Sequence, residues 1–381
     1  MEYRAFGRTG LELSAFTIGG MRFPHGWDEP HDHLPEDSLT VTARVVEEGL
    51  TAGCNLIETA QGYGKSERLL GQVLPHLPSP LRGRYHLMTK GRPRGTGDQF
   101  RRNLEESLGH LGVDRVALFA IHGINTEAEY RATFERGGCL EAALRARDQG
   151  LVGHVGFSSH APLDLLLRTL ASGAFEFVDL HYYYFRTGNA PALALARALG
   201  MGVFIISPND KGGRLYDPPD QLRRLTRPLH PVNFNERWLL AHPEIHTLSL
   251  GLSAPGQMAI HLDSLAPRPW WGPAERQAEA RLRAAVADPL RADCGTRCRR
   301  CLPCPERIDI PELMRLRHLA ESYGMLPFAR YRYGEMQPDD AWVPGARGDS
   351  CTRCGDCRPR CPAGFDLPAL MHQSHRLFHN P

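Results

Sequence analysis

The sequence lacks the features of a secreted or membrane-spanning chain. Its N-terminus, MEYRAFGRTGLELSAF, carries four charged residues where a signal peptide would need an apolar run. No apolar stretch elsewhere reaches the roughly 20 residues of a membrane-spanning helix. The formal net charge is only +2 at pH 7, so electrostatics favours neither nucleic acid nor an acidic membrane as partner. We therefore expect a cytoplasmic protein whose partner is a small-molecule substrate.

Cysteine is nearly absent from most of the chain. Only Cys54 and Cys139 occur before residue 294, and the other eight of the ten cysteines lie between Cys294 and Cys361. A secreted disulfide scaffold would spread its cysteines through the fold, whereas a cluster of this kind in a cytosolic chain more often binds metal. The sequence also lacks a Gly-x-Gly-x-x-Gly motif or any other recognisable flavin site.

Between residue 10 and about residue 265, short apolar runs alternate with longer amphipathic stretches. We expect strands at AFTIGG, CNLIETA, YHLMTK, VALFAIH, LVGHVGFS, FEFVDLHYY, MGVFIIS and IHTLSLGL. We expect helices at DSLTVTARVVEEGLTAG, FRRNLEESLGHLG, LEAALRARDQG, LDLLLRTLASG and APALALARALG. Eight strands with a helix after nearly every one predict a (β/α)₈ TIM barrel, in which catalytic residues lie at the C-terminal ends of the strands.

The chain is predicted to contain two domains joined by a connector. Residues 1–267 form the barrel, and residues 268–290, which begin proline-rich and then become charged, form a helical connector. Residues 291–381 form a small helical ferredoxin-like iron–sulfur domain. This last part holds an internal repeat, because CPERIDIPELMRLRH from Cys304 matches CPAGFDLPALMHQSH from Cys361. Each copy predicts a cysteine loop, an extended Asp-x-Pro turn and a short helix.

The eight clustered cysteines form two loops. The first is Cys294-x₃-Cys298-x₂-Cys301-x₂-Cys304-Pro, and the second is Cys351-x₂-Cys354-x₂-Cys357-x₃-Cys361-Pro. The second has the spacing of bacterial two-cluster ferredoxins, including the terminal Cys-Pro, and the first moves the three-residue gap to the front. We predict two [4Fe–4S] clusters. The alternative is a pair of structural zinc sites, although zinc ribbons usually pair two Cys-x-x-Cys units across a hairpin.

The resemblance to two-cluster ferredoxins also implies how the cysteines are shared. In those proteins the fourth cysteine of each loop ligates the other loop's cluster. One cluster would then be held by Cys294, Cys298, Cys301 and Cys361. The other would be held by Cys351, Cys354, Cys357 and Cys304.

Four residues with catalytic chemistry fall at predicted strand ends. They are Glu58 and Tyr63 in IETAQGYG, Lys90 in LMTKG and His122 in FAIHG. Charged groups at such positions are enriched in active sites but are not restricted to them. A barrel-end ion pair between Glu58 and Lys90 without catalysis is therefore the structural alternative.

Across residues 1–265 the sequence resembles the aldo-keto reductase superfamily. GRTGLELSAFTIGGMRF is similar to that family's first hairpin and strand, and GYGKSERLLGQVL is similar to its Tyr-Gly and Ser-Glu-x-Leu-Leu-Gly signature. LEESLGHLGVDRVALFAIHG resembles the segment that leads to the family histidine, and SPNDKGGRL resembles its seventh-strand loop. The similar segments occur in the family's order.

The resemblance implies a reaction in which a nicotinamide exchanges hydride with a carbonyl while a tyrosine protonates the oxygen. Tyr63 would be the general acid, with its pKa lowered by Lys90. His122 would hydrogen-bond and orient the carbonyl oxygen. Glu58 occupies the place of the family's aspartate, which pairs with the lysine, so its extra methylene either shifts Lys90 or reshapes the pocket.

The resemblance also implies binding of NADP(H) or NAD(H). The implied contact positions are Gly20, Met21, Ser158, Ser159, Asp179, Tyr182, Ser207, Lys211, Gly212, Gly251, Ser253 and Gln257. Several positions depart from the family pattern: Ser159, Tyr183 and His261 stand for asparagine, and Asp179 stands for glutamine. The loop after the eighth strand has no lysine or arginine to pair with a 2′-phosphate. We therefore expect weak binding of both nucleotides.

Three functions are compatible with the sequence. The first is an oxidoreductase whose clusters exchange single electrons with the barrel site, supplied by a ferredoxin or another electron donor. The second is a nicotinamide-dependent carbonyl reductase whose clusters are structural or redox-sensing. The third is a non-redox barrel that performs acid–base chemistry, as a lyase or isomerase. The first is favoured because two clusters at electron-transfer spacing exceed what scaffolding requires.

Overall fold

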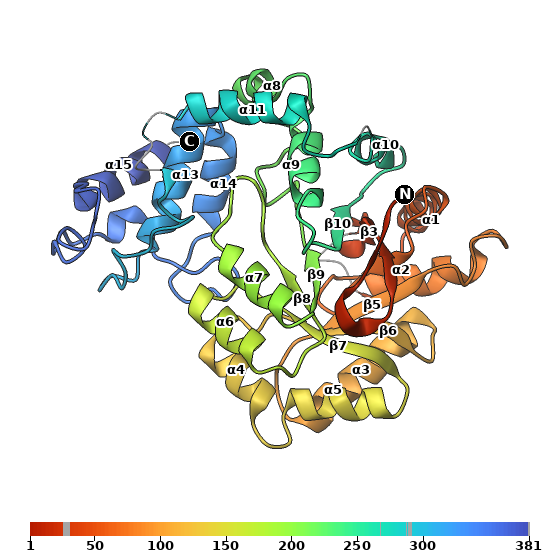
Figure 1. Ribbon diagram of the computed structural model, residues 1–381. Helices are drawn as coiled ribbons and strands as arrows, with labels where there is room; N and C mark the ends of the chain where they lie inside the picture. The colour runs from red at the N-terminus through yellow and green to blue at the C-terminus, as the bar shows by residue number, and fades with distance from the viewer. Residues whose placement is uncertain (26–30, 267, 287, 289–291, 380–381) are drawn as a thin grey trace. The chain divides into compact units, whose positions relative to one another are not determined.

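A closed barrel of eight parallel strands dominates the computed structural model, which describes residues 1–25, 31–266, 268–286, 288 and 292–379 (Figure 1). Neighbouring strands follow the order β10-β3-β4-β5-β6-β7-β8-β9. Their bounds are Phe16–Gly19 (β3), Leu56–Glu58 (β4), His86–Gly91 (β5), Val116–Ile121 (β6), Val152–Ser158 (β7), Phe177–Leu180 (β8), Gly202–Ile205 (β9) and Thr247–Gly251 (β10). Each strand overlaps one of the eight predicted runs, so the predicted (β/α)₈ barrel is confirmed.

Helices follow most of the barrel strands (Figure 1). Their bounds are Glu36–Thr51 (α1), Ser66–Val73 (α2), Gly97–Leu111 (α3), Glu127–Phe134 (α4), Cys139–Asp148 (α5), Leu163–Ala171 (α6), Ala190–Ala198 (α7) and Met258–Leu262 (α10), with short 3₁₀ turns at Gly7–Thr9 (η1), Gly20–Arg22 (η2) and Leu74–His76 (η3). The five predicted helices are present as α1, α3, α5, α6 and α7. As the sequence indicates, α3 ends at a glycine, Gly112, with the left-handed φ of 65° that this position favours.

An N-terminal hairpin supplies apolar side chains to the barrel core. Its strands, Tyr3–Ala5 (β1) and Glu12–Ser14 (β2), pair antiparallel. Phe6 and Leu13 are fully buried in one cluster with barrel residues, which are Leu56, Met88, Leu118, Ala120, Phe177, Phe204 and Ile206. The interior is therefore packed at this level, and any site must lie further toward the C-terminal ends of the strands.

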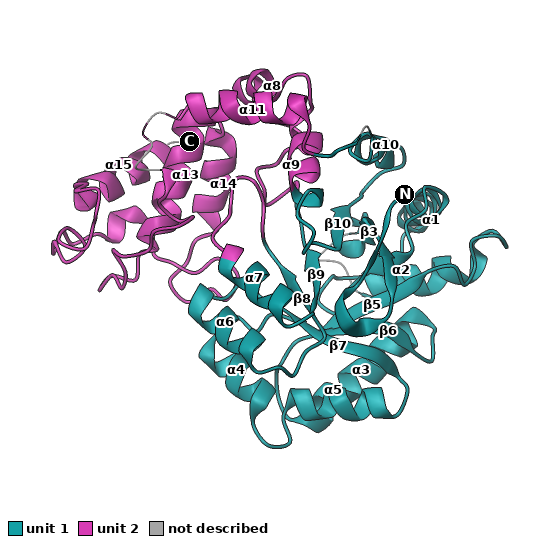
Figure 2. Ribbon diagram, viewed as in Figure 1, with its two compact units in different colours: residues 1–181, 191–208, 239–270 teal, residues 182–190, 209–238, 271–381 magenta. Residues whose placement is uncertain are grey.

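The chain divides into two compact units (Figure 2). Unit 1 comprises residues 1–181, 191–208 and 239–270, and unit 2 comprises residues 182–190, 209–238 and 271–381. Unit 2 thus includes two segments of the first 267 residues besides the C-terminal region. Residues 287, 289 and 290 of the predicted connector, and residues 291, 380 and 381 of the predicted C-terminal domain, lie outside the described residues. The linear boundaries at 267 and 290 stay predictions.

Unit 2 is helical in the part of the chain that the structure describes. Its elements are Asp220–Thr226 (α8), Pro231–Leu240 (α9, most of which belongs to this unit), Pro273–Ala284 (α11), Ile310–Tyr323 (α13), Leu326–Glu335 (α14), Gly348–Ser350 (η4) and Leu367–His379 (α15). Helices α13, α14 and α15 pack against one another. Helix α11 is the charged helix that the sequence predicts within residues 268–290.

The internal repeat is visible in the structure of unit 2. Asp309 caps α13 by accepting a hydrogen bond from the N–H of Glu312 at 3.2 Å, and Asp366 accepts one from the N–H of Ala369 at 3.2 Å at the start of α15. Each aspartate also pairs with an arginine of its own cysteine loop, Arg299 at 3.2 Å and Arg358 at 2.8 Å. The predicted Asp-x-Pro turn followed by a short helix is present in both copies.

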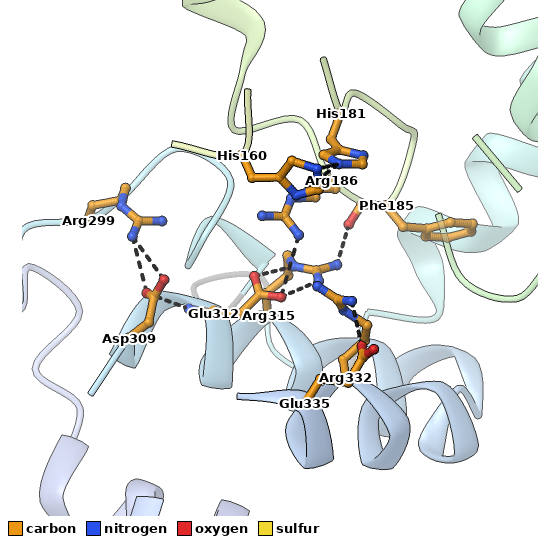
Figure 3. A network of polar contacts seen from close by, with 10 residues as sticks. All are labelled: His160, His181, Phe185, Arg186, Arg299, Asp309, Glu312, Arg315, Arg332 and Glu335. Atoms are coloured by element: carbon orange, nitrogen blue, oxygen red, sulfur yellow. Dashed lines mark hydrogen bonds and ion pairs between the residues drawn. The ribbon is translucent and has the colours of Figure 1, made fainter. Parts of the chain in front are cut away.

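A buried polar network joins α13 to the 182–190 segment of unit 2 (Figure 3). Arg315, which is 2% exposed, donates to both carboxylate oxygens of Glu312 at 2.9 and 2.6 Å and to the carbonyl of Phe185 at 3.1 Å. Arg186 lies 3.7 Å from the same carboxylate. The arginine charges hold the pKa of Glu312 below its ordinary value despite burial, so this network is ionised at neutral pH.

No helix among the described residues is both long and apolar enough to cross a membrane.

Candidate active site and cysteine loops

Strand alternation brings the predicted catalytic residues to one level of the barrel. Leu56, Met88 and Ala120 belong to the buried interior cluster. Because side chains two residues apart along a strand face the same side, Glu58, Lys90 and His122 face the interior as well, one layer nearer the C-terminal ends. All three are nearly inaccessible, at 2%, 1% and 7% exposed.

The structure brings the four predicted catalytic side chains together. The Tyr63 hydroxyl lies 3.2 Å from Oε1 of Glu58 and 3.2 Å from Nζ of Lys90. Lys90 also donates to Oε1 of Glu58 and to the carbonyl of Thr59, the latter at 3.0 Å. The ring of His122 stands edge-on to the ring of Tyr63 with centroids 5.6 Å apart. A tyrosine hydroxyl is thus held beside a buried lysine–glutamate pair.

The expected lowering of the pKa of Tyr63 by Lys90 is wrong. Burial raises the pKa of Tyr63 above its ordinary value, and the charge of Asp179 acts in the same direction. Lys90 does not offset this effect, because it is paired with Glu58 and because burial lowers its own pKa to about 7. Tyr63 is therefore protonated at neutral pH and can donate a proton.

Two further residues complete this layer. The sequence analysis predicted a catalytic role for neither of them. Ser249, on β10, donates to Oε2 of Glu58 at 3.0 Å, which fixes the second oxygen of that carboxylate. Its alternation with apolar neighbours in HTLSLG was the available signal. Asp179, on β8, lies two residues beyond the core residue Phe177 and is fully buried.

Asp179 differs from Glu58 in its surroundings. Neither of its carboxylate oxygens has a hydrogen-bond partner among the described residues. Burial raises the pKa of Asp179 to about 7, against the opposing effect of the Lys90 charge. The layer therefore contains two carboxylates and one lysine.

Nine of the predicted cofactor residues belong to unit 1, where they lie in or just after the strands β3, β7, β8, β9 and β10. Met21 is 40% exposed, and Gly20 packs so closely on Ser66 that a Cβ there would lie 2.4 Å from its Oγ. Ser207 has a left-handed φ of 49°. Besides these three and Asp179, the others are Ser158, Ser159, Gly251, Ser253 and Gln257.

Side-chain hydrogen bonds within the loops engage several of these residues. Ser159 Oγ donates to the carbonyl of Ile124 at 2.9 Å and accepts from the N–H of Ala161 at 3.0 Å. Ser158 Oγ accepts from the N–H of Gly123 at 2.9 Å. Gln257 Oε1 accepts from the N–H of Ser253 at 2.8 Å, which closes the loop after β10 on itself. His261, which stands where the family has asparagine, is fully buried and its ring contacts that of Phe16.

The other three predicted cofactor residues, Tyr182, Lys211 and Gly212, belong to unit 2. Tyr182 stacks on Trp238 with ring centroids 5.2 Å apart. Burial and the charge of Arg332 lower the pKa of Lys211 to about 8. Next to it, Arg214 lies over the ring of Tyr331 at 3.8 Å from the centroid. The residues 209–216 that resemble the seventh-strand loop therefore pack on α14.

The two cysteine loops are arranged within unit 2 across the repeat. Four cysteines, which are Cys304, Cys351, Cys354 and Cys357, line one cavity together with Ile308, Ile310 and Met371. Burial raises the pKa of Cys294 to about 11, and the neighbouring thiols of Cys298 and Cys361 act in the same direction. Cys304 thus lies with the first three cysteines of the second loop, and Cys361 lies near Cys294 of the first.

None of the ten cysteines forms a disulfide. No three histidine, cysteine, aspartate or glutamate side chains converge closely enough to hold a metal ion in the part of the chain that the structure describes. The predicted iron–sulfur clusters therefore stay a prediction.

Comparison with known proteins assigns the barrel to a family. Residues 15–259 match the aldo/keto reductase family, and the chain belongs to it. The chain is 28% identical over 297 residues to 6-dehydroglucose reductase of Novosphingobium aromaticivorans, which covers 70% of this chain and 91% of that protein. It is 28% identical over 221 residues to L-galactose dehydrogenase of Arabidopsis thaliana, which covers 55% of this chain and 65% of that protein.

A solved structure has the same fold. An aldo-keto reductase of Bacillus halodurans in its holo form matches with a TM-score of 0.60 at 19% identity and covers 74% of this chain and 96% of its own. The protein is accordingly an oxidoreductase. This class excludes the lyase or isomerase alternative.

Proposed function

We propose that the protein is an iron–sulfur oxidoreductase of the aldo-keto reductase type, which interconverts a small carbonyl compound and its alcohol. The reaction occurs at Tyr63, Lys90, His122 and Glu58, and the electrons pass from or to two [4Fe–4S] clusters in unit 2. The observation that carries the proposal is the shared cavity of Cys304 with the first three cysteines of the other loop.

Each of the four side chains has a distinct role. Tyr63 holds the proton that a carbonyl oxygen takes up on reduction, because burial keeps its hydroxyl protonated. His122 binds the same oxygen and orients it. Lys90 holds the hydroxyl of Tyr63 in place at 3.2 Å, and Glu58 holds Lys90 with the help of Ser249. An oxygen hydrogen-bonded by two side chains in a water-poor site is stabilised as it gains negative charge.

The cysteine arrangement fits two clusters that share ligands between the loops better than it fits two sites that are each held by one loop. Thiols from both copies of the repeat border one cavity, and apolar residues make up most of the rest of its lining, beside Glu306, Thr352 and Arg360. Such a shell limits solvent access, which is one determinant of the reduction potential of a cluster. The clusters, when bound, supply one electron each. Reduction of a carbonyl to an alcohol takes two electrons and two protons: the two clusters would supply the electrons, Tyr63 the proton on oxygen, and water the proton on carbon.

The substrate class is proposed from the relatives. Both curated relatives are named for sugars, a dehydroglucose and L-galactose. We propose a hexose or a keto derivative of one as the substrate, and a ferredoxin or another one-electron protein as the electron donor. A cytoplasmic location stays a prediction from the sequence.

One experiment tests the electron source directly. Anaerobically reconstituted protein is titrated with reduced ferredoxin, NADPH and NADH in parallel, while cluster absorbance is followed. We expect reduced ferredoxin to bleach the clusters and the nucleotides to leave them unchanged. Substrate addition should then restore the absorbance in the wild type but not in Tyr63→Phe, and loss of that difference would contradict the proposal.

The second candidate is an NAD(P)H-dependent carbonyl reductase with structural or redox-sensing clusters. The family match over residues 15–259 favours it, because members of this family typically use a nicotinamide. Steady oxidation of NADPH by the protein with a sugar substrate, at the same rate whether the clusters are oxidised or reduced, would establish it.

A further inference from the structure

The starting point is an imbalance of buried charge in the barrel site. Glu58, Lys90 and Asp179 are 2%, 1% and 0% exposed. Lys90 pairs with Glu58, which leaves Asp179 without a counter-charge in contact. An ionised carboxylate in a protein interior is costly unless a hydrogen bond or an opposite charge compensates it.

The environment of Asp179 supplies no such compensation. Both carboxylate oxygens lack a hydrogen-bond partner among the described residues. On the neighbouring strand β7 the residue in register is Ser158, whose hydroxyl accepts from Gly123, and on β9 it is Phe204. The titratable groups whose electrostatic effects couple to Asp179 are Lys90 on β5 and Tyr63 after β4. Neither forms a hydrogen bond with it.

We propose that Asp179 binds a positively charged group of the molecule that occupies the barrel site, so that the site selects cationic ligands over neutral ones of the same shape. This deepens the proposed function and rests on it for the location of the site. A cation beside Asp179 supplies the counter-charge that this carboxylate lacks. A neutral ligand leaves the carboxylate either charged and unpaired or protonated.

Two sources can supply the cation. One is the ring of an oxidised nicotinamide nucleotide, and the other is an ammonium group on the substrate. The probes are therefore two matched pairs, NADP⁺ with NADPH and an aminohexose with the corresponding hexose. Which pair shows the preference identifies the source.

The experiment measures the affinity of each probe by isothermal titration at pH 8, where Asp179 is ionised. The variants are Asp179→Asn and, as a matched control, Asp164→Asn on the exposed side of α6. For the wild type and the control we expect the cationic member of one pair to bind at least about tenfold more tightly, since a charge-assisted contact is lost with the neutral member. Asp179→Asn should bind both members equally.

Three outcomes would overturn the proposal: equal affinities within both pairs for the wild type, a preference that persists in Asp179→Asn, or no binding of any of the four probes. A second measurement separates this result from misfolding, because the circular dichroism of Asp179→Asn must match that of the wild type. Binding needs neither turnover nor clusters. Failure here therefore leaves the proposed electron route untouched, and failure of that route leaves this preference measurable.

Discussion

The hydroxyl of Tyr63 lies 3.2 Å from Nζ of Lys90, and both groups contact the same oxygen of Glu58. The three side chains come from β4, the turn after it and β5, so adjacent parallel strands set their separation. Because Glu58 is longer than aspartate, its carboxylate reaches both partners and also Ser249 on β10. The extra methylene is thus accommodated by a serine on the far side of the carboxylate.

Tyr63→Phe should reduce turnover by roughly 10²- to 10⁴-fold, the usual contribution of a positioned general acid. The change deletes one hydroxyl and leaves the ring against His122, so folding and iron content should stay unchanged. The matched control is Tyr85→Phe, at a half-buried tyrosine just before β5. Retained turnover in Tyr63→Phe with any identified substrate would show that another group supplies the proton.

Stability should depend on pH through Asp179. Its pKa is raised from 3.8 to about 7 in the folded protein, so between these values the folded state holds a proton that the unfolded state lacks. The stabilisation from this group is complete below pH 3.8 and is lost as the pH rises through 7. Lys90 acts above that range, because its lowered pKa makes stability rise from about pH 7 toward 10.5.

Asp179→Asn should remove only the part of this pH dependence of stability that lies below about pH 7. The midpoint of thermal unfolding of the variant, relative to that of the wild type, should rise as the pH goes from 4 to 7 and then level off. Scanning calorimetry of both proteins across this range measures the difference. Asp164→Asn should show no trend, and a flat difference for Asp179→Asn would mean that the carboxyl is not buried in solution.

The sharing of cysteines between loops can be tested by iron content. The wild type should contain close to eight irons and eight acid-labile sulfides, and serine at Cys351, Cys354 and Cys357 should leave about four. In that triple variant, Cys304→Ser should cost no further iron, whereas Cys361→Ser should cost the remaining cluster. The reverse result would mean that each loop holds its own cluster, and stoichiometric zinc without sulfide would refute both arrangements. Cys139→Ser is the control, at a buried cysteine of α5.

The ion pair between Glu312 and Arg315 should stabilise unit 2. Arg315 is 2% exposed and Glu312 13%, and removal of one partner from a buried pair costs about 3–5 kcal/mol. Glu312→Gln should therefore lower the free energy of unfolding of unit 2 in denaturant titrations. Glu105→Gln, in the exposed pair with Arg101 on α3, should change it by less than about 1 kcal/mol. Equal effects of the two substitutions would contradict the network in Figure 3.

The barrel and its catalytic layer were accessible from the sequence because both depend on local patterns. Alternation along each strand fixes that Glu58 and Lys90 face inward, and the strand order then brings them together. The sequence did not indicate which residues before position 268 belong to unit 2. Nothing in the local sequence of Phe185 or Arg214 indicates their partners Arg315 and Tyr331, which lie more than 100 residues away along the chain. The same holds for Ser249, whose partner Glu58 lies at the opposite end of the barrel sequence.

The nicotinamide contacts were the least predictable part of the site, because loops carry them and tertiary contacts decide loop structure. Ser159 and Gln257 use their side-chain atoms to bond their own loops. The nicotinamide contacts therefore stay predictions from the match of residue types.

The final prediction concerns the choice between NADPH and NADH. The loop after β10 has no cation of its own, and Glu48 accepts a hydrogen bond from the N–H of Gly256 in that loop at 2.7 Å. A 2′-phosphate there lacks a charge-assisted contact worth about 1.5–3 kcal/mol, roughly ten- to a hundredfold in affinity. We expect weak binding of both nucleotides with little discrimination, measured by isothermal titration.

Tight and NADPH-selective binding would contradict this expectation and would require a base from outside the loop. Within unit 1, Arg22 of η2 packs over Gly251, where a Cβ would lie 2.6 Å from its Cδ. Arg22→Ala would then remove the selectivity. Glu48→Gln offers the opposite change, since removal of this carboxylate should strengthen NADPH binding while leaving NADH binding unchanged. A response of NADPH alone to Glu48→Gln would place the 2′-phosphate beside Gly256.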